Sequence, residues 1–481
     1  MRKILLGTTA VVSAVVGAAV MAPEASAQEA PTVRIGGYFR AYYGYTQQSS
    51  RNSVTGTGMP LNVGSGTEGI PGNSPTGAVA GANTARLGKH DISTDAGIDV
   101  IVNGKLANGI TYGATISLNS NGLEGRQVVN GRASAGKTTV AVDEMYAFIA
   151  HARFGQVRFG DEDGVMGGLM NSGWVQGFGT GGVHGSWESF VTRQAGGRTV
   201  TAPGGIGDAS KIIYMSPQFF GFDFGASYAP NANVGEDTGC PNNSGSGYCD
   251  SAYAFSGARN FGIYAAGPEQ AVKRNEVQAA LRWRGNYAGV GLAATVGYIG
   301  SGAARDLASA NGSQWRVFNG LNIWQVGAQA SAYGFTLGAN YTWGDYNFFW
   351  GNTMRGDRQA EQLTIGAQYT YGPFTIGSNF VTGLFEGGSK NTYSENAAGT
   401  AVTSVGCRAT ANVNVSNNCA MMRRWGVSVG ANYRLAPGMD LIAEWVHYSV
   451  REQGRDLDPV RPGIQSRAFS DVFILGTRLA F

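Results

Sequence analysis

The sequence predicts an all-β chain that spans a membrane as a closed antiparallel barrel of about sixteen strands. Three observations predict it: an N-terminal segment typical of export, many segments with apolar residues at every second position, and no later apolar run long enough for a spanning helix. The last strand shows the alternation, with one face made of Phe473, Leu475, Leu479 and Phe481 and the other of Val472, Ile474, Gly476 and Arg478. We therefore expect a tube that is apolar outside and wet inside.

Residues 1–27 have the composition of a cleavable secretory signal peptide. Arg2 and Lys3 precede an apolar stretch over 4–21, and Ala25-Ser26-Ala27 forms a small-residue cleavage site. A retained membrane anchor is the alternative, but the stretch is short and interrupted by hydroxyl residues. We expect export, cleavage, and a mature chain of residues 28–481 that forms one barrel domain.

The charge of the mature chain argues against nucleic acid as a partner. Removing Arg2, Lys3 and Glu24 from the 35 basic and 32 acidic residues leaves 33 and 31, a net charge of +2, and the basic residues are dispersed. Many of the 75 glycines fall in long irregular stretches, and many others occupy the polar phase of strands. In the strands we expect the missing side chains to relieve crowding inside a curved wall.

The first three strands are expected at about 33–46, 91–106 and 110–119. In the first of these strands Ile35, Phe39 and Tyr43 alternate with polar or cationic residues, so the apolar set would face lipid. The second and third strands are joined by Asn108-Gly109, a strong signal for a tight hairpin. Between the first two, residues 47–89 are expected to be loop, because they are rich in Gly, Ser, Asn, Thr and Pro and lack periodicity.

The rest of the chain repeats one order: strand, very short turn, strand, long loop. The short turns are expected at 151–155, 217–221, 285–287, 333–334, 371–373 and 436–438. The long loops are expected at 120–137, 161–209, 230–273, 301–319, 344–359, 383–422 and 450–469. This asymmetry predicts a periplasmic rim of short turns and an extracellular rim of long loops, with sixteen strands whose first and last members pair.

Polar residues on the inward phase distinguish this barrel from a soluble β-sandwich. A dry sandwich core would leave buried Arg, Asp, Gln and Asn uncompensated at several kcal/mol each. The inward phase of many strands carries such residues, and aromatic rings gather at strand ends, as at the two interfaces of a membrane. We therefore expect a water-filled lumen.

The four cysteines form two local pairs, each within one expected loop. Cys240 lies close to Cys249, and Cys407 to Cys419. In an exported chain this spacing favours two loop disulfides over free thiols, although four cysteines allow three connectivities. A zinc site needs more ligands than either pair offers, and no histidine lies beside them.

Several segments taken in order are similar to those of the trimeric sixteen-stranded general diffusion porins of Gram-negative outer membranes. They are the opening Gly36-Gly37-Tyr38-Phe39-Arg40, the segments 142–148 and 154–160, the stretch 213–217 with 221–222 and 226–230, the turn 435–439, and the terminal Phe481. The resemblance implies a channel for passive diffusion of ions and small hydrophilic solutes. It also implies a homotrimer surrounded by outer-membrane lipid and lipopolysaccharide, a third loop folded into the lumen, and recognition of Phe481 by the barrel assembly machinery.

In this resemblance the constriction loop corresponds to residues 161–209, whose carboxylates would face a cationic wall. The acidic candidates are Asp161, Glu162, Asp163 and Glu188 of the loop and Asp99 of the wall. The basic candidates are Arg34, Arg40, Arg282, Arg424, Arg434 and Arg478. Opposed charges at a narrow waist create a transverse field that orients dipolar solutes. For any single arginine the alternative is a wall charge balanced by a strand neighbour such as Asp99 or Glu444.

Some features of the sequence point to functions other than a diffusion channel. The long loops leave open a solute-specific channel or a surface adhesin or receptor on the same barrel. An outer-membrane lipase would need His184, Ser186 and Glu188 as a triad, but the sequence has no nucleophile elbow. The glycine pattern at 177–182 follows no strand, and Asp161-Glu162-Asp163-Gly164 has no closing glutamate, so no cofactor and no metal are expected.

Overall fold

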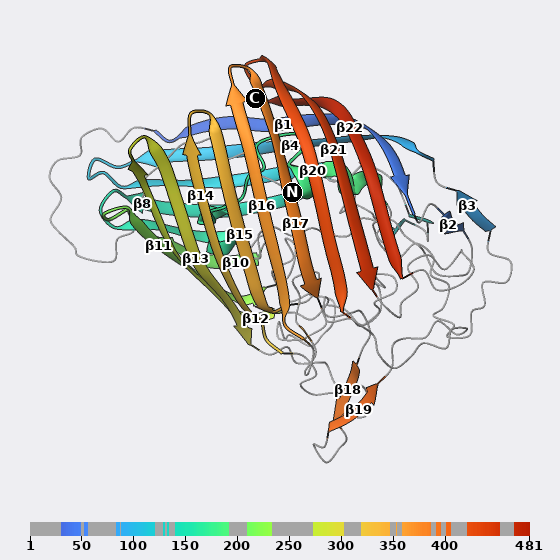
Figure 1. The fold of residues 1–481 in the computed structure, drawn as a ribbon. Helices are drawn as coiled ribbons and strands as arrows, with labels where there is room; N and C mark the ends of the chain where they lie inside the picture. The colour runs from blue at the N-terminus through green and yellow to red at the C-terminus, as the bar shows by residue number, and fades with distance from the viewer. Residues whose placement is uncertain are drawn as a thin grey trace.

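Sixteen antiparallel strands close into one barrel, as expected from the sequence (Figure 1). The computed structural model describes residues 30–49, 52–55, 83–86, 88–120, 128–129, 132–133, 140–191, 209–232, 273–302, 319–346, 353, 358–385, 391–395, 401–405, 421–452 and 466–481. The barrel strands are β1 (Thr32–Gln48), β4 (His90–Lys105), β5 (Thr111–Asn119), β8 (Ala141–His151), β9 (Gly155–Glu162), β10 (Ala209–Met215), β11 (Phe222–Ala232), β12 (Lys273–Tyr287), β13 (Val290–Gly302), β14 (Asn322–Ala332), β15 (Phe335–Asp345), β16 (Ala360–Tyr371), β17 (Phe374–Phe385), β20 (Met422–Ala436), β21 (Met439–Glu452) and β22 (Arg467–Ala480). Figure 1 shows neighbouring arrows running in opposite directions around the ring.

The first and last strands seal the barrel. β1 pairs with β22 from Tyr38↔Ala480 onward and with β4 on its other edge. The Gly37 amide donates to the Phe481 carbonyl at 2.9 Å, and the Phe481 amide donates to the Gly37 carbonyl at 3.1 Å. The terminal residue therefore completes the ladder, and the sheet keeps no open edge.

The short connections are tight hairpins, and two of them show why glycine is needed. At Ala288-Gly289 and at Tyr333-Gly334 both residues have positive φ, which is the backbone of a type I′ turn. The seven short connections between barrel strands lie at one rim, together with the start of β1 and the end of β22. The eight long connections lie at the other rim. The expected division into one rim of short turns and one rim of long loops is confirmed.

The two faces of the wall follow the predicted alternation. On β22 the side chain of Leu475 is 58% exposed on the outer face, whereas the neighbouring Ile474 is 1% exposed on the inner face. Aromatic residues pair on the outer face near the strand ends, for example Phe335 with Tyr369 and Phe374 with Tyr433. No helix in the described ranges is long and apolar enough to cross a bilayer.

Three of the long loops contain short hairpins that the sequence did not predict. They are formed by β2 (Asn52–Thr55) with β3 (Asn83–Arg86), β6 (Val128–Val129) with β7 (Arg132–Ala133), and β18 (Asn391–Glu395) with β19 (Ala401–Val405). The expectation of unstructured loop at 47–89, 120–137 and 383–422 was therefore wrong in these places. Strands of two to five residues are too short for a period of two to stand out.

We predict that Leu475→Arg makes the barrel folded in phospholipid vesicles less stable by about 2–4 kcal/mol, because the substitution places a cation in hydrocarbon near the middle of the wall. Tyr371→Arg, at the end of β16, is the matched control and should cost at most about 1 kcal/mol. Urea titrations followed by tryptophan fluorescence measure both values. Equal losses in the two variants would contradict the assignment of the outer face.

Candidate pore constriction

The third long connection folds into the barrel. After β9 it continues through the helical turns η1 (Val165–Leu169), η2 (Gly182–His184) and η3 (Ser186–Phe190), which Figure 1 shows inside the ring of strands. The turn η1 contacts β11, β12 and β13, η2 contacts β17, β20 and β21, and η3 contacts β1, β4 and β22. The described part, residues 163–191, therefore runs along the inner wall from β11 round to β1. The inward fold expected for the third loop is confirmed.

A row of inward-facing glycines forms the seat of this loop. A Cβ atom added at Gly327 would overlap the backbone carbonyl oxygen of Ser172, and one added at Gly377 would overlap the ring of Phe178. The same conflict with loop atoms arises at Gly44, Gly225, Gly297, Gly338, Gly366 and Gly430. These glycines occur on eight strands, so the missing side chains let the loop approach the wall backbone closely. The glycines of the inward phase thus accommodate the loop as well as the curvature.

Amide and hydroxyl side chains of the wall bind the first half of the loop. Gln278 accepts a hydrogen bond from the Met166 amide at 3.0 Å. Ser172 is held by the Thr295 hydroxyl at 2.7 Å and by the Asn340 amide at 3.2 Å. Each contact replaces one that the loop backbone or side chain would otherwise make with water, so the loop is bound along its length.

Asn379 and Glu444 bind the second half. Asn379 accepts from the Val183 amide at 3.0 Å and donates to the Val175 carbonyl at 3.2 Å. Glu444 accepts from the amides of Thr180 at 3.1 Å and Gly182 at 2.7 Å, and also from the Thr180 hydroxyl. These three partners of Glu444 are all donors, which suits a carboxylate with two acceptor oxygens.

The end of the loop packs on an apolar surface of the inner wall. The Trp187 ring lies 5.0 Å from that of Tyr448, and both are fully buried. Around them several inward residues of β21 and β22 are apolar, namely Ile442, Val446, Val450, Val472 and Ile474. The expectation of a polar inward face fails here because the loop, rather than water, covers these strands.

The six basic candidates lie in different surroundings. Arg40 lies over the Tyr38 ring and pairs with Asp95 at 3.5 Å. Arg282 pairs with Asp223 at 2.5 Å and donates to the loop carbonyl of Leu169 at 3.1 Å. Arg478 and Arg434 share Asp440, at 2.6 and 3.8 Å. Arg424 is buried beside Met422 and Phe385. Arg34 is exposed near the start of β1.

The acidic candidates are divided between strand and loop. Asp161 and Glu162 are the last residues of β9 and are buried, so the loop begins at Asp163. Glu188 lies in η3. On the wall, Asp99 accepts from the Ser117 hydroxyl at 2.5 Å.

Some wall charges, such as Glu144 and Arg158, were missed as candidates by the sequence reasoning. Arg158 pairs with Glu162 at 2.9 Å and lies over the Tyr146 ring. Its position in the inward phase, next to the outward Phe159, was a signal that could have identified it. In the described part of the chain no group of three or more His, Cys, Asp or Glu side chains could hold a metal ion.

The strand order places a charged part of the wall opposite the third loop. In the strand order β5 lies half a ring away from β15, so the wall of β4, β5, β8 and β9 faces the middle of the loop. That wall carries Asp95, Asp99, Glu144, Arg158 and Glu162, next to Arg40 on β1. The loop and a wall of mixed charge therefore lie on opposite sides of the lumen.

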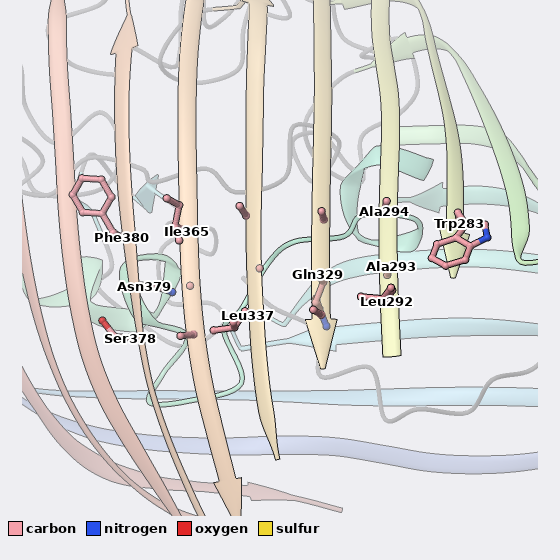
Figure 2. Close-up of a pocket in the computed structure, with 16 residues that line it drawn as sticks. Trp283, Leu292, Ala293, Ala294, Gln329, Leu337, Ile365, Ser378, Asn379 and Phe380 are labelled. Carbon is pink, nitrogen blue, oxygen red and sulfur yellow. The ribbon is translucent and has the colours of Figure 1, made fainter. Parts of the chain in front are cut away.

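One hollow lies on the outside of the barrel. It has a volume of ≈ 790 Å³ and an apolar lining, and Figure 2 shows Leu337, Ile365 and Phe380 projecting from β15, β16 and β17. These three side chains are on the exposed outer face. The hollow is therefore a depression in the lipid-facing wall and is separate from the lumen.

Comparison with known proteins gives a family match and structural matches that cover nearly the whole chain. A family profile described as Gram-negative porin matches residues 8–453. Among solved structures, a mutant of the Rhodopseudomonas blastica porin aligns with a TM-score of 0.43 at 13% identity, over 94% of this chain and 100% of that one. OmpT, an outer membrane protein of Vibrio cholerae, aligns with a TM-score of 0.47 at 10% identity, over 94% and 98%. No curated protein sequence matches.

We predict that Gly327→Ala displaces the loop toward the lumen, because the new methyl group overlaps the Ser172 carbonyl. The expected results are a lower single-channel conductance and a loss of about 1–3 kcal/mol of stability, as for overpacking in a core. Gly291→Ala is the control, because its Cβ would lie 3.6 Å from its nearest neighbour, the Ser331 carbonyl oxygen. Conductance that is unchanged in Gly327→Ala would show that the loop does not depend on this seat.

Proposed function

The chain belongs to the Gram-negative porin family, and from this we propose that ions and small hydrophilic solutes cross it through the waist between the third loop and the wall of β4, β5, β8 and β9. The protein is an outer-membrane channel for passive diffusion. The observation that carries the proposal for the waist is the loop bound along the inner wall from Gln278 to Glu444. A loop held in this way would keep the passage narrow.

Charged side chains on the open part of the wall are proposed to set ion preference. Arg40 beside Asp95 and Arg158 beside Glu162 are ion pairs that present both signs to the lumen. Arg282 is proposed to act in part through the loop, since it holds the Leu169 carbonyl. The remaining basic and acidic candidates stay proposals of the same kind, with Arg34 and Arg434 at the periplasmic end.

The assembly of the channel is also proposed. We infer a homotrimer, a signal peptide removed after residue 27, and a role for Phe481 in recognition by the assembly machinery. The hydrogen bonds between Phe481 and Gly37 support the last point, because a missing terminal residue would leave the barrel seam incomplete. The cysteine pairs Cys240–Cys249 and Cys407–Cys419 are proposed as disulfides and lie outside the described residues.

The alternative as a lipase finds little support in the loop. Ser186 donates its backbone amide to the Thr180 hydroxyl, and that hydroxyl is bound by Glu444. His184 and Glu188 belong to the same bound segment. These residues are better explained as parts of the constriction.

Reconstitution in planar bilayers tests the proposal. The purified protein should give stepwise conductance in multiples of a trimeric unit, with current linear in solute concentration. Arg40→Gln should raise, and Asp161→Asn should lower, the ratio of cation to anion permeability by about twofold, if the charges that they remove face the passage as proposed. Reversal potentials in a salt gradient measure the ratio.

Arg153→Gln, in the exposed turn between β8 and β9, is the control for the loss of one positive charge. Reversal potentials that do not move in either test variant would remove both residues from the selectivity filter. Saturable transport of one solute would instead favour a solute-specific channel.

A further inference from the structure

The rim of short turns carries more basic than acidic side chains around the lumen. In the four residues of each barrel strand nearest to this rim, the described chain has two side-chain carboxylates, Asp223 and Asp440. The α-carboxylate of Phe481 lies at the same rim. The cations of the lumen-facing phase in the same zone are Arg34, Lys105, Arg158, Arg284, Arg434 and Arg478. Arg158 is paired with Glu162 farther along its own strand, and the others leave this end of the lumen electropositive.

The first aspartate of this rim is shared by two arginines of β12. Asp223 accepts from Nε of Arg282 at 3.1 Å and from its Nη2 at 2.5 Å, and Arg284 donates to the same carboxylate at 2.8 Å. The Arg282 side chain is 16% exposed, and its Nη1 donates to the Leu169 carbonyl of the third loop at 3.1 Å. The Arg284 side chain is 38% exposed, so its guanidinium group keeps donors for a further acceptor. Two guanidinium groups and one carboxylate leave an excess of one positive charge.

The second aspartate is shared in the same way by arginines of β20 and β22. Asp440 on β21 is bound to Arg478 at 2.6 Å, and Arg434 lies 3.8 Å from the same carboxylate. The Arg478 side chain is 22% exposed, whereas that of Arg434 is 70% exposed. In both triads, therefore, one arginine is held tightly by the aspartate and the other presents its guanidinium group to the lumen.

The two arginine–aspartate–arginine triads face each other beside the third loop. Five strands separate β12 from β20 in the ring, and six separate β11 from β22, so the triads lie on opposite sides of the lumen. Arg284 is two residues, or about 7 Å, from the loop-binding Arg282, and Asp440 is four residues, or about 14 Å, from the loop-binding Glu444. Both steps lead toward the rim of short turns. A solute that has passed the loop must therefore pass between the triads.

We propose that the two triads bind small oxyanions with two negative charges, on the short-turn side of the third loop. A guanidinium group donates two parallel hydrogen bonds to neighbouring oxygens and stays charged at every physiological pH. The excess charge of each triad, within a rim that has few carboxylates, favours a divalent anion over a monovalent one. The inference rests on the proposed function, since a conducting lumen brings solutes to the triads. It adds the class of solute that this second site would retain.

Inhibition of the single-channel chloride current by sulfate tests the proposal. Sulfate added at constant ionic strength should reduce the current of the wild type in planar bilayers. The double variant Arg284→Gln with Arg434→Gln should raise the half-inhibiting sulfate concentration at least about tenfold, because it removes one charge-assisted donor group from each triad. The two aspartates keep their tightly bound arginines in this variant, so the barrel should fold and conduct.

The matched control removes the same charge from the same rim outside the triads. In the described ranges no ion pair is found for Arg34 or Lys105, and both are exposed. Arg34→Gln with Lys105→Gln should change the half-inhibiting concentration by at most about twofold, since distant charges in water are screened. An equal effect of the two double variants would overturn the proposal, because the rim as a whole would then attract the anion. Nitrate that inhibits as strongly as sulfate would contradict the preference for two charges.

Calorimetry of sulfate binding to the refolded protein in detergent separates the triads from the pore. Binding by the wild type that is weakened in Arg284→Gln with Arg434→Gln supports the proposal without any measurement of current. Wild-type protein that binds sulfate but does not conduct would contradict the proposed channel and leave the triads standing. Wild-type protein that conducts, but neither binds sulfate nor is inhibited by it, would overturn the inference and leave the channel intact.

Discussion

Pairing of every backbone amide and carbonyl within the wall is the constraint on which the rest of the structure depends. Hydrocarbon offers no hydrogen-bond partner, so a sheet that crosses it must close on itself. The two hydrogen bonds between Gly37 and Phe481 complete that closure at the end of the chain. Closure then determines which way each side chain points, because a closed sheet has one face toward lipid and one toward the lumen, and residues alternate between these faces.

The interior of the barrel is organised by the third loop. Glycines on eight strands give it room, and Gln278, Asn379 and Glu444 bind it at successive positions. The loop therefore divides the inner wall into a covered part, which includes an apolar surface on β21 and β22, and an open part that carries ion pairs. The difference between the two parts explains why the inward residues of one barrel are hydrophobic on some strands and charged on others.

Local patterns predicted the wall well and the interior poorly. Alternation, hairpin signals such as Asn108-Gly109, and the even strand number are properties of neighbouring residues, so they were visible in the sequence. The contact between Glu444 and Thr180 joins residues 264 positions apart, and no local pattern reveals it. Asp161 and Glu162 were assigned to the loop because no local pattern marks the end of the strand, although β9 continues through them. The inward fold of the loop came from family resemblance and not from periodicity.

The path of the loop also has a mechanical meaning. A cylinder of sixteen strands that stays hollow has no packed centre to resist flattening, and lateral pressure in a membrane acts on its full circumference. Because the loop is attached to strands on well-separated parts of the ring, from β12 through β21 to Thr46 on β1, it ties those parts together from within. The third loop thus also resists flattening of the barrel, because it connects opposite parts of the wall from within.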